Sequence, residues 1–312
     1  MTFRLWINML EGDGFASGER LSCILLRMHY HYRYMRFVAF VFATFLSAAS
    51  LQAQSVNIVA AENFYGGIAH QIAGNAAEVT SILSNPNQDP HEFQTDATTA
   101  KAVEQADIVI YSGIGYDDWM QKLLGLKGKP GRTVICVADL IGAKSGDNPH
   151  IWYDPRTMPA LAEKLAEILK QPGRVAAFDK SMGELTAEIA KIKSAHAGTP
   201  VTATEPVFGY MAGALGFNML NYSFQIAVMN DTEPSFKDTS GFEKSLTGGA
   251  AKILFYNSQV SDPVTQRMQS IAKSSNVPVV GVTETQPPSS KSYVAWMMSE
   301  LKDVETAFAQ AH

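Results

Sequence analysis

The stretch "VNIVAAENFYGGIAHQIAG" (residues 56–74) decides the fold class. Its first part, "VNIVAAENF" (56–64), is a short apolar run of the kind that forms a strand buried on both faces of a sheet. Its second part, "YGGIAHQIAG" (65–74), has apolar residues at the spacing of an amphipathic helix. A strand followed directly by a helix is the repeating unit of a parallel sheet, so the fold class depends on whether the unit recurs.

The strand–helix unit does recur along the chain. Further strands are predicted at 78–84, 107–113, 132–138, 200–208, 251–258 and 277–283. Helices are predicted at 97–106, 117–125, 154–170, 262–275 and 291–311. Alternation at this spacing is typical of βα units around a parallel sheet. The sequence therefore predicts an α/β protein with two parallel-sheet lobes joined by a single long helix.

The predicted joining helix has one apolar face. Its apolar residues step by four, three, four and three positions: Phe178, Met182, Leu185, Ile189 and Ile192. We predict an N-terminal lobe at 54–172, the linking helix at 173–197 and a C-terminal lobe at 198–312. Because a helical link bends less readily than a pair of loops, we expect little movement between the lobes.

The N-terminal region has the pattern of an export signal. Arg36 is followed by an apolar run at 37–49 and by the small-residue cleavage site "LQA" (51–53). This pattern predicts a secretory signal peptide at 35–53, too short for a membrane span. Residues 1–34 would bury the signal internally, so we expect them to be a non-native extension and translation to start at Met35.

Cysteine content and charge limit the class of the exported product. Cys136 is the single cysteine after the predicted cleavage site, so no internal disulfide forms, and we expect a thiol buried in its strand. No cysteine follows the signal, so we expect a soluble periplasmic monomer without a direct membrane anchor. The net charge is −5 with no basic run, which excludes nucleic acid as an expected partner.

Four polar residues follow predicted strands. His91 and His150 follow the strands at 78–84 and 132–138, while Glu205 and Glu284 lie at the ends of two strands of the second lobe. In open α/β sheets, ligands bind at the carboxyl ends of the strands. Each residue alone is more typical of a surface, capping or ion-paired role, so the hypothesis of a site depends on the set.

Proline restricts the backbone beside both histidines. Pro90 and Pro149 directly precede His91 and His150, and proline fixes φ near −65° and favours an extended conformation in the residue before it. Ligands held in place before an ion arrives bind it more tightly. The two loops therefore indicate a metal site. We also predict that Asp154 caps the helix that follows His150.

The chain resembles the zinc- and manganese-binding receptors of bacterial ABC importers over residues 54–308. Five stretches carry the resemblance: "DPHEFQTDATTAKAVEQADIVIYSGIGYDDWMQKLL" (89–124), "NPHIWYDPRTMPALAEKLAEIL" (148–169), "ATEPVFGYMAGALGF" (203–217), "NDTEPSFKD" (230–238) and "SYVAWMMSEL" (292–301). An ordered set of this kind is far more specific than any one motif. The resemblance implies C-clamp lobes joined by a rigid helix and delivery of the ion to a membrane permease.

The resemblance also implies a ligand set. His91 and His150 match the first two ligands of the family. Glu205 stands where zinc-type members usually have histidine and several manganese-type members have glutamate. Glu284 stands in place of the usual aspartate, one methylene longer. The His-rich loop of many zinc members is absent, since no histidine lies between His91 and His150.

The chemical types of the four candidate ligands indicate which ion the site would favour. Carboxylate oxygens suit Mn²⁺ and Fe²⁺, and two bidentate carboxylates would raise the coordination number above the four that zinc usually takes. Raw affinity nevertheless favours zinc at nearly any such site. Ligand type thus favours manganese, with zinc a strong competitor and Fe²⁺ a third candidate. The ion is the transported ligand, and we expect no catalytic residues.

Two other classes of protein remain as alternatives. A metallohydrolase needs an open coordination position and a general base, for which Glu92 is the candidate. A receptor for an organic ligand such as a siderophore needs aromatic and arginine residues along its cleft. Tyr65, Trp119, Trp152 and Tyr222 are the available aromatic residues.

Overall fold

The computed structural model describes residues 29, 35, 55–85, 93–260 and 262–310. Apart from His29 and Met35, the predicted extension at 1–34 and the predicted signal peptide at 35–53 lie outside the described residues. Residues 55–312 form one compact unit, separate from 1–54.

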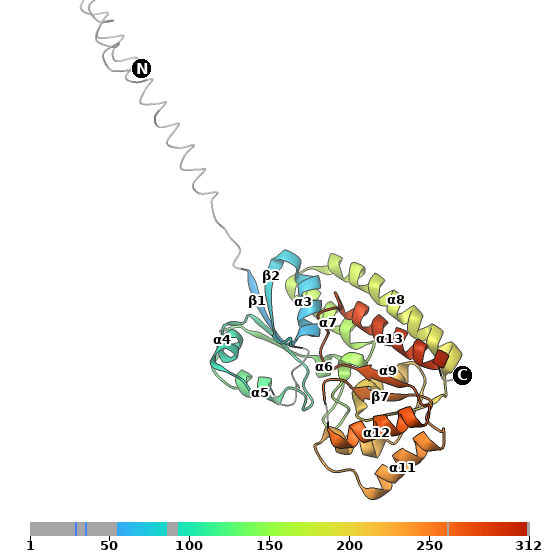
Figure 1. Cartoon of the computed structure of the whole chain (residues 1–312). Helices are drawn as coiled ribbons and strands as arrows, with labels where there is room; N and C mark the ends of the chain where they lie inside the picture. The colour runs from blue at the N-terminus through green and yellow to red at the C-terminus, as the bar shows by residue number, and fades with distance from the viewer. Residues whose placement is uncertain (1–28, 30–34, 36–54, 86–92, 261, 311–312) are drawn as a thin grey trace, which may run out of the picture. The chain divides into compact units, whose positions relative to one another are not determined.

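Two parallel four-stranded sheets form the framework of this unit (Figure 1). The first consists of β1 (Val56–Glu62), β2 (Ala77–Leu83), β3 (Ile108–Tyr111) and β4 (Thr133–Cys136), in the order β2-β1-β3-β4. The second consists of β5 (Pro200–Ala203), β6 (Asn218–Leu220), β7 (Leu254–Asn257) and β8 (Val279–Val282), in the order β6-β5-β7-β8. The two sheets share one strand order, so each has a switch point between its first and third strands, where ligands bind in such folds. The predicted fold class is confirmed.

Helices cover both faces of each sheet. The helices of the first half are α3 (Asn63–Ala73), α4 (Ala97–Gln105), α5 (Asp118–Leu124), α6 (Val137–Ile141) and α7 (Thr157–Leu169). The helix α8 (Pro172–His196) follows them. The helices of the second half are α9 (Gly209–Ala214), α10 (Tyr222–Met229), α11 (Phe236–Thr247), α12 (Pro263–Ser274) and α13 (Tyr293–Gln310). Short 3-10 helices lie at η1 (Gly74–Ala76), η3 (Ile151–Tyr153) and η4 (Pro206–Phe208).

The burial of both faces of strand β1 explains the apolar run at residues 56–64. Ile58 and Ala60 join the large core that contains residues of α3 and α7, whereas Val59 and Ala61 join a second cluster with residues of α4 and α5. Successive side chains of a strand point to opposite faces. Because both faces of this sheet are covered, apolar residues are needed at every one of these positions.

Gly66, in the first turn of α3, allows this helix to pack closely on the sheet. A Cβ atom on Gly66 would lie 2.0 Å from Oγ and 3.3 Å from Cβ of Ser81 in β2, so the serine side chain would have to move aside. The apolar residues Ile68 and Ile72 of the same helix are fully buried. Gly66 therefore lets the helix approach the strand closely.

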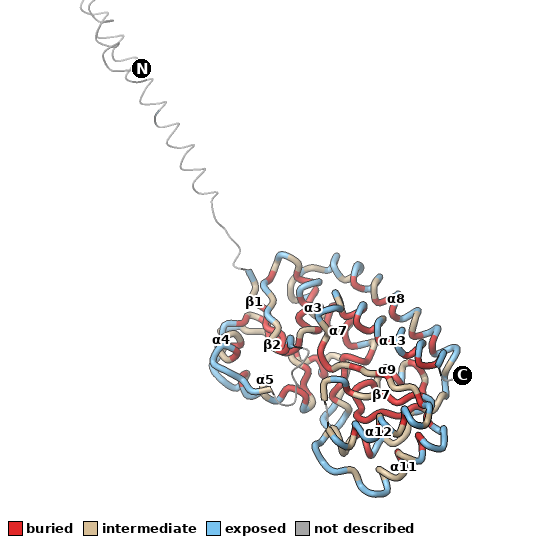
Figure 2. Tube along the Cα trace, viewed as in Figure 1, coloured by how far each residue is buried: buried red, intermediate tan, exposed pale blue. Residues whose placement is uncertain are grey.

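A shared aromatic core holds the two halves together. The ring centroid of Phe64, at the start of α3, lies 4.9 Å from that of Trp152 and 5.8 Å from that of Trp296 in α13. Tyr153 contacts Trp296 and Phe208, with centroids 5.7 and 5.4 Å apart. Buried residues (red in Figure 2) run through the strands and the helix faces that contact this core. The halves thus share one apolar cluster.

The long helix α8 lies along α7 and α13 (Figure 1). It begins with Pro172, whose fixed φ and missing N–H suit the first helical turn. The five apolar residues predicted to form its inner face are its buried residues. Helix periodicity therefore predicted the contact face correctly.

Several predicted elements differ in extent. β4 ends at Cys136, and residues 137–138 begin α6 instead of continuing the strand. β5 ends at Ala203, and a 3-10 turn starts at Pro206, which has no N–H to donate to a strand ladder. Cys136 is half-buried, not buried, because β4 is an edge strand of its sheet.

Other elements went unpredicted or begin elsewhere. β6 has three residues, too few to show a period, and α10 and α11 follow it. Helix α7 begins at Thr157, so Asp154 is not its cap. Its carboxylate instead accepts a hydrogen bond from the backbone N–H of Arg156 at 2.9 Å and pairs with the Arg156 guanidinium.

Candidate metal site

The imidazole of His150 is held by Asn148. Oδ1 of Asn148 lies 2.7 Å from Nδ1 of His150 and accepts a hydrogen bond from the backbone N–H of His150 at 3.1 Å. An amide oxygen accepts, so Nδ1 carries a proton, and in the neutral ring Nε2 carries the lone pair. The ring is fully buried, and no described residue hydrogen-bonds to Nε2. This is the orientation that a metal-ligating histidine needs.

The carboxylate of Glu284 faces this lone pair. Its Oε2 lies 3.6 Å from Nε2 of His150, and neither side chain is exposed. Glu284 follows β8, and its backbone N–H donates to Oε1 of Gln259 at 2.5 Å. The same oxygen accepts from the N–H of Thr285 at 2.9 Å. Gln259 therefore fixes the turn from which Glu284 projects.

Glu205 reaches the same place from β5. It is 5% exposed and precedes Pro206. Nδ2 of Asn257 lies 3.5 Å from Oε2 of Glu205 and 2.5 Å from Oε1 of Glu284. One buried amide thus connects the two carboxylates, which identifies Asn257 as a member of the cluster.

Among the four predicted ligands, His150 lies beside Glu284, and Asn257 links Glu284 to Glu205. His91 lies outside the described residues. Within 55–85, 93–260 and 262–310, no group of three or more His, Cys, Asp or Glu side chains is arranged to hold a metal ion. Between the two carboxylates lies the amide of Asn257.

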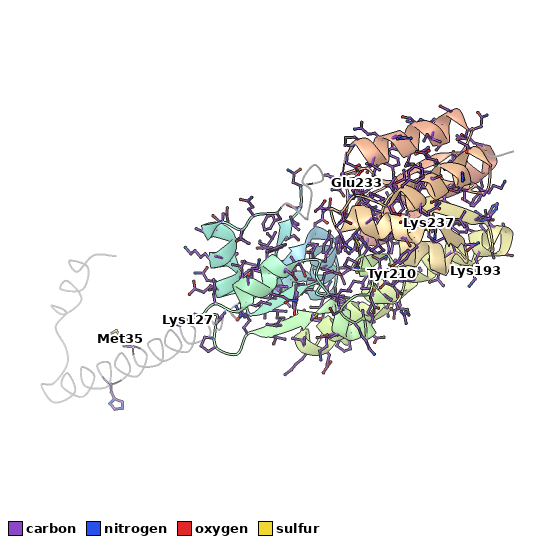
Figure 3. The ribbon with its side chains drawn as sticks, turned by 90° about the horizontal axis from the view of Figure 1, so that it is seen from below. Met35, Lys127, Lys193, Tyr210, Glu233 and Lys237 are labelled. Carbon is purple, nitrogen blue, oxygen red and sulfur yellow. The ribbon has the colours of Figure 1, made fainter. Side chains whose placement is uncertain are left out.

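Hydrogen bonds join the two halves beside the cluster. Nδ2 of Asn148 donates to the carbonyl of Pro206 at 2.7 Å, and the hydroxyl of Tyr210 donates to the carbonyl of Asn148 at 2.9 Å. Tyr210 is labelled in Figure 3. Asn148 therefore fixes the loop of His150 to the segment that carries Glu205. Asn148 also lines a groove of about 490 Å³, together with Tyr210 and Tyr222.

Aromatic side chains form a wall around His150. The ring centroids of Tyr116 and Trp152 lie 6.1 and 5.3 Å from that of His150. Both residues are buried. Burial raises the pKa of the Tyr116 hydroxyl well above its usual value, and the nearby carboxylate of Glu284 raises it further. Tyr116 is therefore a neutral hydroxyl beside Glu284.

A second pair of buried acids lies at the switch point of the first sheet. Glu62 ends β1, and Asp117 follows β3; neither is exposed. Burial raises the pKa of Glu62 well above its usual value, and the charge of Asp117 adds to the rise. Burial raises the pKa of Asp117 to about 6, although the N–H groups of Gly113 and Ser112 donate to it and lower the pKa. Burial and the nearness of the second acid therefore favour the protonated form of Glu62.

A third buried acid supports the turn before Glu284. Glu300 of α13 accepts hydrogen bonds from the hydroxyl of Tyr153 at 2.8 Å, from Nε1 of Trp296 at 2.9 Å and from the backbone N–H of Thr283 at 3.2 Å. Burial raises its pKa to about 8, although these donors act in the opposite direction. Glu300 therefore fixes Thr283 from the aromatic core.

Sequence reasoning missed the amides at the site. Asn148 entered the prediction only as the residue before a proline, and neither Asn257 nor Gln259 was singled out. Asn257 is the last residue of β7. The rule that ligands bind at the carboxyl ends of strands, which selected Glu284, therefore also applies to Asn257. Glu62, the last residue of β1, was missed in the same way.

The fold and the cluster define a class of protein: a two-lobed α/β protein with a buried His–Glu cluster at the strand ends. The chain belongs to the family described as ZnuA, zinc-uptake complex component A, periplasmic, whose profile matches residues 58–307. None of the helices in the described part of the chain is both long and apolar enough to cross a membrane.

Curated relatives are similar over most of the chain. The zinc-binding lipoprotein AdcA of Streptococcus pneumoniae is 22% identical over 83% of this chain, and the chain spans 58% of that protein. The manganese ABC transporter substrate-binding lipoprotein PsaA of the same species is 23% identical over 82% of this chain and 90% of its own length.

Solved structures share the fold. The periplasmic zinc-binding protein TroA of Treponema pallidum superimposes with a TM-score of 0.67 at 17% identity, covering 81% of this chain and 99% of its own. FpvC of Pseudomonas aeruginosa, solved with Mn²⁺, has a TM-score of 0.67 at 17% identity, covering 83% and 100%.

Proposed function

We propose that the protein captures a divalent transition-metal ion, Mn²⁺ or Zn²⁺, and delivers it to the permease of an ABC importer. The ligands are His91, His150, Glu205 and Glu284. The observation that carries the proposal is the buried approach of His150 Nε2 to Glu284 Oε2, at 3.6 Å, with Nδ1 of the same ring already engaged by Asn148.

This distance suits two ligands of one ion. Zinc lies about 2.0–2.2 Å from histidine nitrogen and carboxylate oxygen, so two donor atoms of one tetrahedral ion lie roughly 3.3–3.6 Å apart. Glu205 and Glu284 together supply two negative charges, which balance a divalent cation. Neutral imidazoles add no charge, so the bound site carries no net charge.

The family supplies the context of uptake. PsaA is named for manganese and AdcA for zinc, and FpvC was solved with Mn²⁺. The candidate ions for this chain are accordingly Mn²⁺, Zn²⁺ and, on ligand chemistry alone, Fe²⁺. We infer from the signal-like stretch at 35–53 that the receptor acts in the periplasm. We propose in addition that it is a soluble monomer without catalysis of its own.

An organic ligand such as a siderophore is a weaker proposal. Tyr65 and Trp152, two of the aromatic residues considered for its cleft, are fully buried in the core. Trp119 packs on Phe93 with ring centroids 4.5 Å apart, which leaves Tyr222. Among the described residues that line the groove beside Asn148, none is arginine.

A metallohydrolase is also a weaker proposal than a metal receptor. It requires an open coordination position and a nearby general base. The candidate base, Glu92, lies outside the described residues, and the four proposed ligands would fill a tetrahedral sphere.

The experiment that tests the metal-receptor proposal is metal analysis of protein purified without chelators, followed by competition between Mn²⁺ and Zn²⁺. Protein that binds neither ion at micromolar concentration would contradict it.

A further inference from the structure

Asn257 lies between the two carboxylate-bearing strands. β7 is hydrogen-bonded to β5 on one side and to β8 on the other. Phe255 pairs with Ala203, so Asn257 stands two residues beyond this pair, as Glu205 does on β5. Asn257 also pairs with Val282, two residues before Glu284. The strand order therefore places one side chain between both acids.

The orientation of the Asn257 amide follows from its hydrogen bonds. Oδ1 accepts from the backbone N–H of Gln259 at 3.0 Å, so the oxygen points to that turn. Nδ2, with two N–H groups, then faces the acids, 2.5 Å from Oε1 of Glu284 and 3.5 Å from Oε2 of Glu205. The reversed amide would place an oxygen against two carboxylates and an NH₂ against an N–H. The side chain is 2% exposed, so bulk water does not replace these contacts.

We propose that Asn257 is a specificity-determining residue that limits Glu205 and Glu284 to one metal-binding oxygen each, which favours zinc over manganese. The proposal rests on the metal-receptor function proposed above. It reverses the preference for manganese that the ligand types alone suggest.

The physical argument is a competition for carboxylate oxygens. A bidentate carboxylate must turn both oxygens toward the ion. In this site one N–H of Asn257 engages Oε1 of Glu284, while Oε2 of the same group faces His150. The other N–H lies toward Oε2 of Glu205. Two monodentate carboxylates and two imidazoles give the four-coordinate sphere typical of zinc in proteins. Two bidentate carboxylates would give a larger, oxygen-rich sphere that suits manganese.

The test measures the ratio of Zn²⁺ to Mn²⁺ affinity in Asn257→Leu and in the unaltered protein, using competition with a chromophoric chelator. Removing the amide should lower the ratio of Zn²⁺ affinity to Mn²⁺ affinity by about tenfold, chiefly because Mn²⁺ binds more tightly. Gln225→Met is the matched control, since Gln225 is a fully buried amide of the same half that donates to the carbonyl of Leu220 instead. A ratio that changes less than about twofold in Asn257→Leu, or equally in both variants, overturns the proposal.

A second measurement needs no variant. X-ray absorption of the full-length protein loaded with Zn²⁺, and separately with Mn²⁺, counts the nitrogen and oxygen neighbours of the ion. Four neighbours around zinc, with manganese completing its sphere from water, is the expected result. Two carboxylates bound through both oxygens in either form overturn the proposal. If the unaltered protein binds neither ion, the receptor function itself fails, and that outcome is distinct from an unchanged ratio.

Discussion

Nε2 of His150 lies 3.6 Å from Oε2 of Glu284, and each of these two side chains is hydrogen-bonded through its other polar atom to a different asparagine. Asn148 engages Nδ1 of the imidazole at 2.7 Å, and Asn257 engages Oε1 of the carboxylate at 2.5 Å. The two asparagines come from different halves of the chain. The preorganisation of the site thus depends on amides that do not themselves face the ion.

The variant His150→Ala should lose stabilisation by metal. A ligand at about 1,000 times its Kd stabilises a protein by about 4 kcal/mol, which appears as a rise in Tm. We expect Zn²⁺ or Mn²⁺ to raise the Tm of the unaltered protein in scanning calorimetry, a chelator to reverse the rise, and His150→Ala to show none. His70→Ala, at an exposed position of α3, is the control. An equal rise in His150→Ala would remove His150 from the ligand set.

The variant Asn148→Ala should weaken metal binding without removing a ligand. Loss of the residue that orients a metal-ligating histidine typically costs 10- to 100-fold in affinity. Asn148 also fixes the carbonyl of Pro206, next to Glu205, so the upper part of that range is expected. The Kd for Zn²⁺, from chelator competition, is the measurement, and Asn218→Ala, at an exposed position of β6, is the control.

Gly209→Ala tests the same role from the neighbouring segment. A Cβ atom there would lie 2.9 Å from Nδ2 of Asn148 and would push the amide away from Pro206. A smaller loss of affinity than in Asn148→Ala is expected, because the imidazole contact can persist. Unchanged affinity in both variants would mean that the ring is positioned by packing against Tyr116 and Trp152 alone.

The sequence predicted those parts of the fold that repeat. Two patterns depend on many residues: the alternation of strands and helices, and the 3.6-residue period of α8. They therefore predicted the two sheets and the inner face of the long helix. Short elements show no such period, which is why β6 and the 3-10 turn at Pro206 were missed. Asp154 has the residue type of a cap, but its pairing with Arg156 depends on local geometry.

The sequence prediction selected charged residues at strand ends and passed over the amides beside them. His150, Glu205 and Glu284 were selected because imidazole and carboxylate are ligand types. Asn257 occupies an equivalent strand end, but an asparagine signals a metal site only once its neighbours are known. Its role follows from strand order, since β7 lies between β5 and β8, and strand order depends on pairing between residues distant in the sequence.

Stability should fall as the pH rises, partly through Glu300. Burial raises the pKa of this carboxyl from its usual 4.5 to about 8. Between these values the folded state retains a proton that the unfolded state has lost, so stabilisation is complete below about pH 4.5 and is lost as the pH approaches 8. One such proton corresponds to about 1.4 kcal/mol per pH unit at most.

Glu300→Gln should flatten this slope. The amide cannot ionise, so the free energy of unfolding, from urea titrations with a chelator present, should vary less between pH 5 and 8 by about 1 kcal/mol per pH unit. A residual slope of the same sign is expected from Glu62, whose pKa is also raised. Glu104→Gln, at an exposed position of α4, should leave the slope unchanged. A slope of the same size in Glu300→Gln would show that Glu300 is ionised in the folded protein.

Binding of the ion should leave the arrangement of the two halves almost unchanged. Asn63 and Gln286 form two reciprocal hydrogen bonds between the halves, at 2.8 and 3.0 Å, and Tyr293 donates to the carbonyl of Trp152 at 2.7 Å. The aromatic core beneath them and the continuous helix α8 oppose a hinge, because opening would expose buried rings to water. Small-angle scattering of the protein with a chelator and with saturating Zn²⁺ should give radii of gyration that agree within about 1 Å, as for other preorganised binding sites. A clear contraction on adding metal would show that the halves rotate despite these contacts, and capture of the ion would then include a closing step.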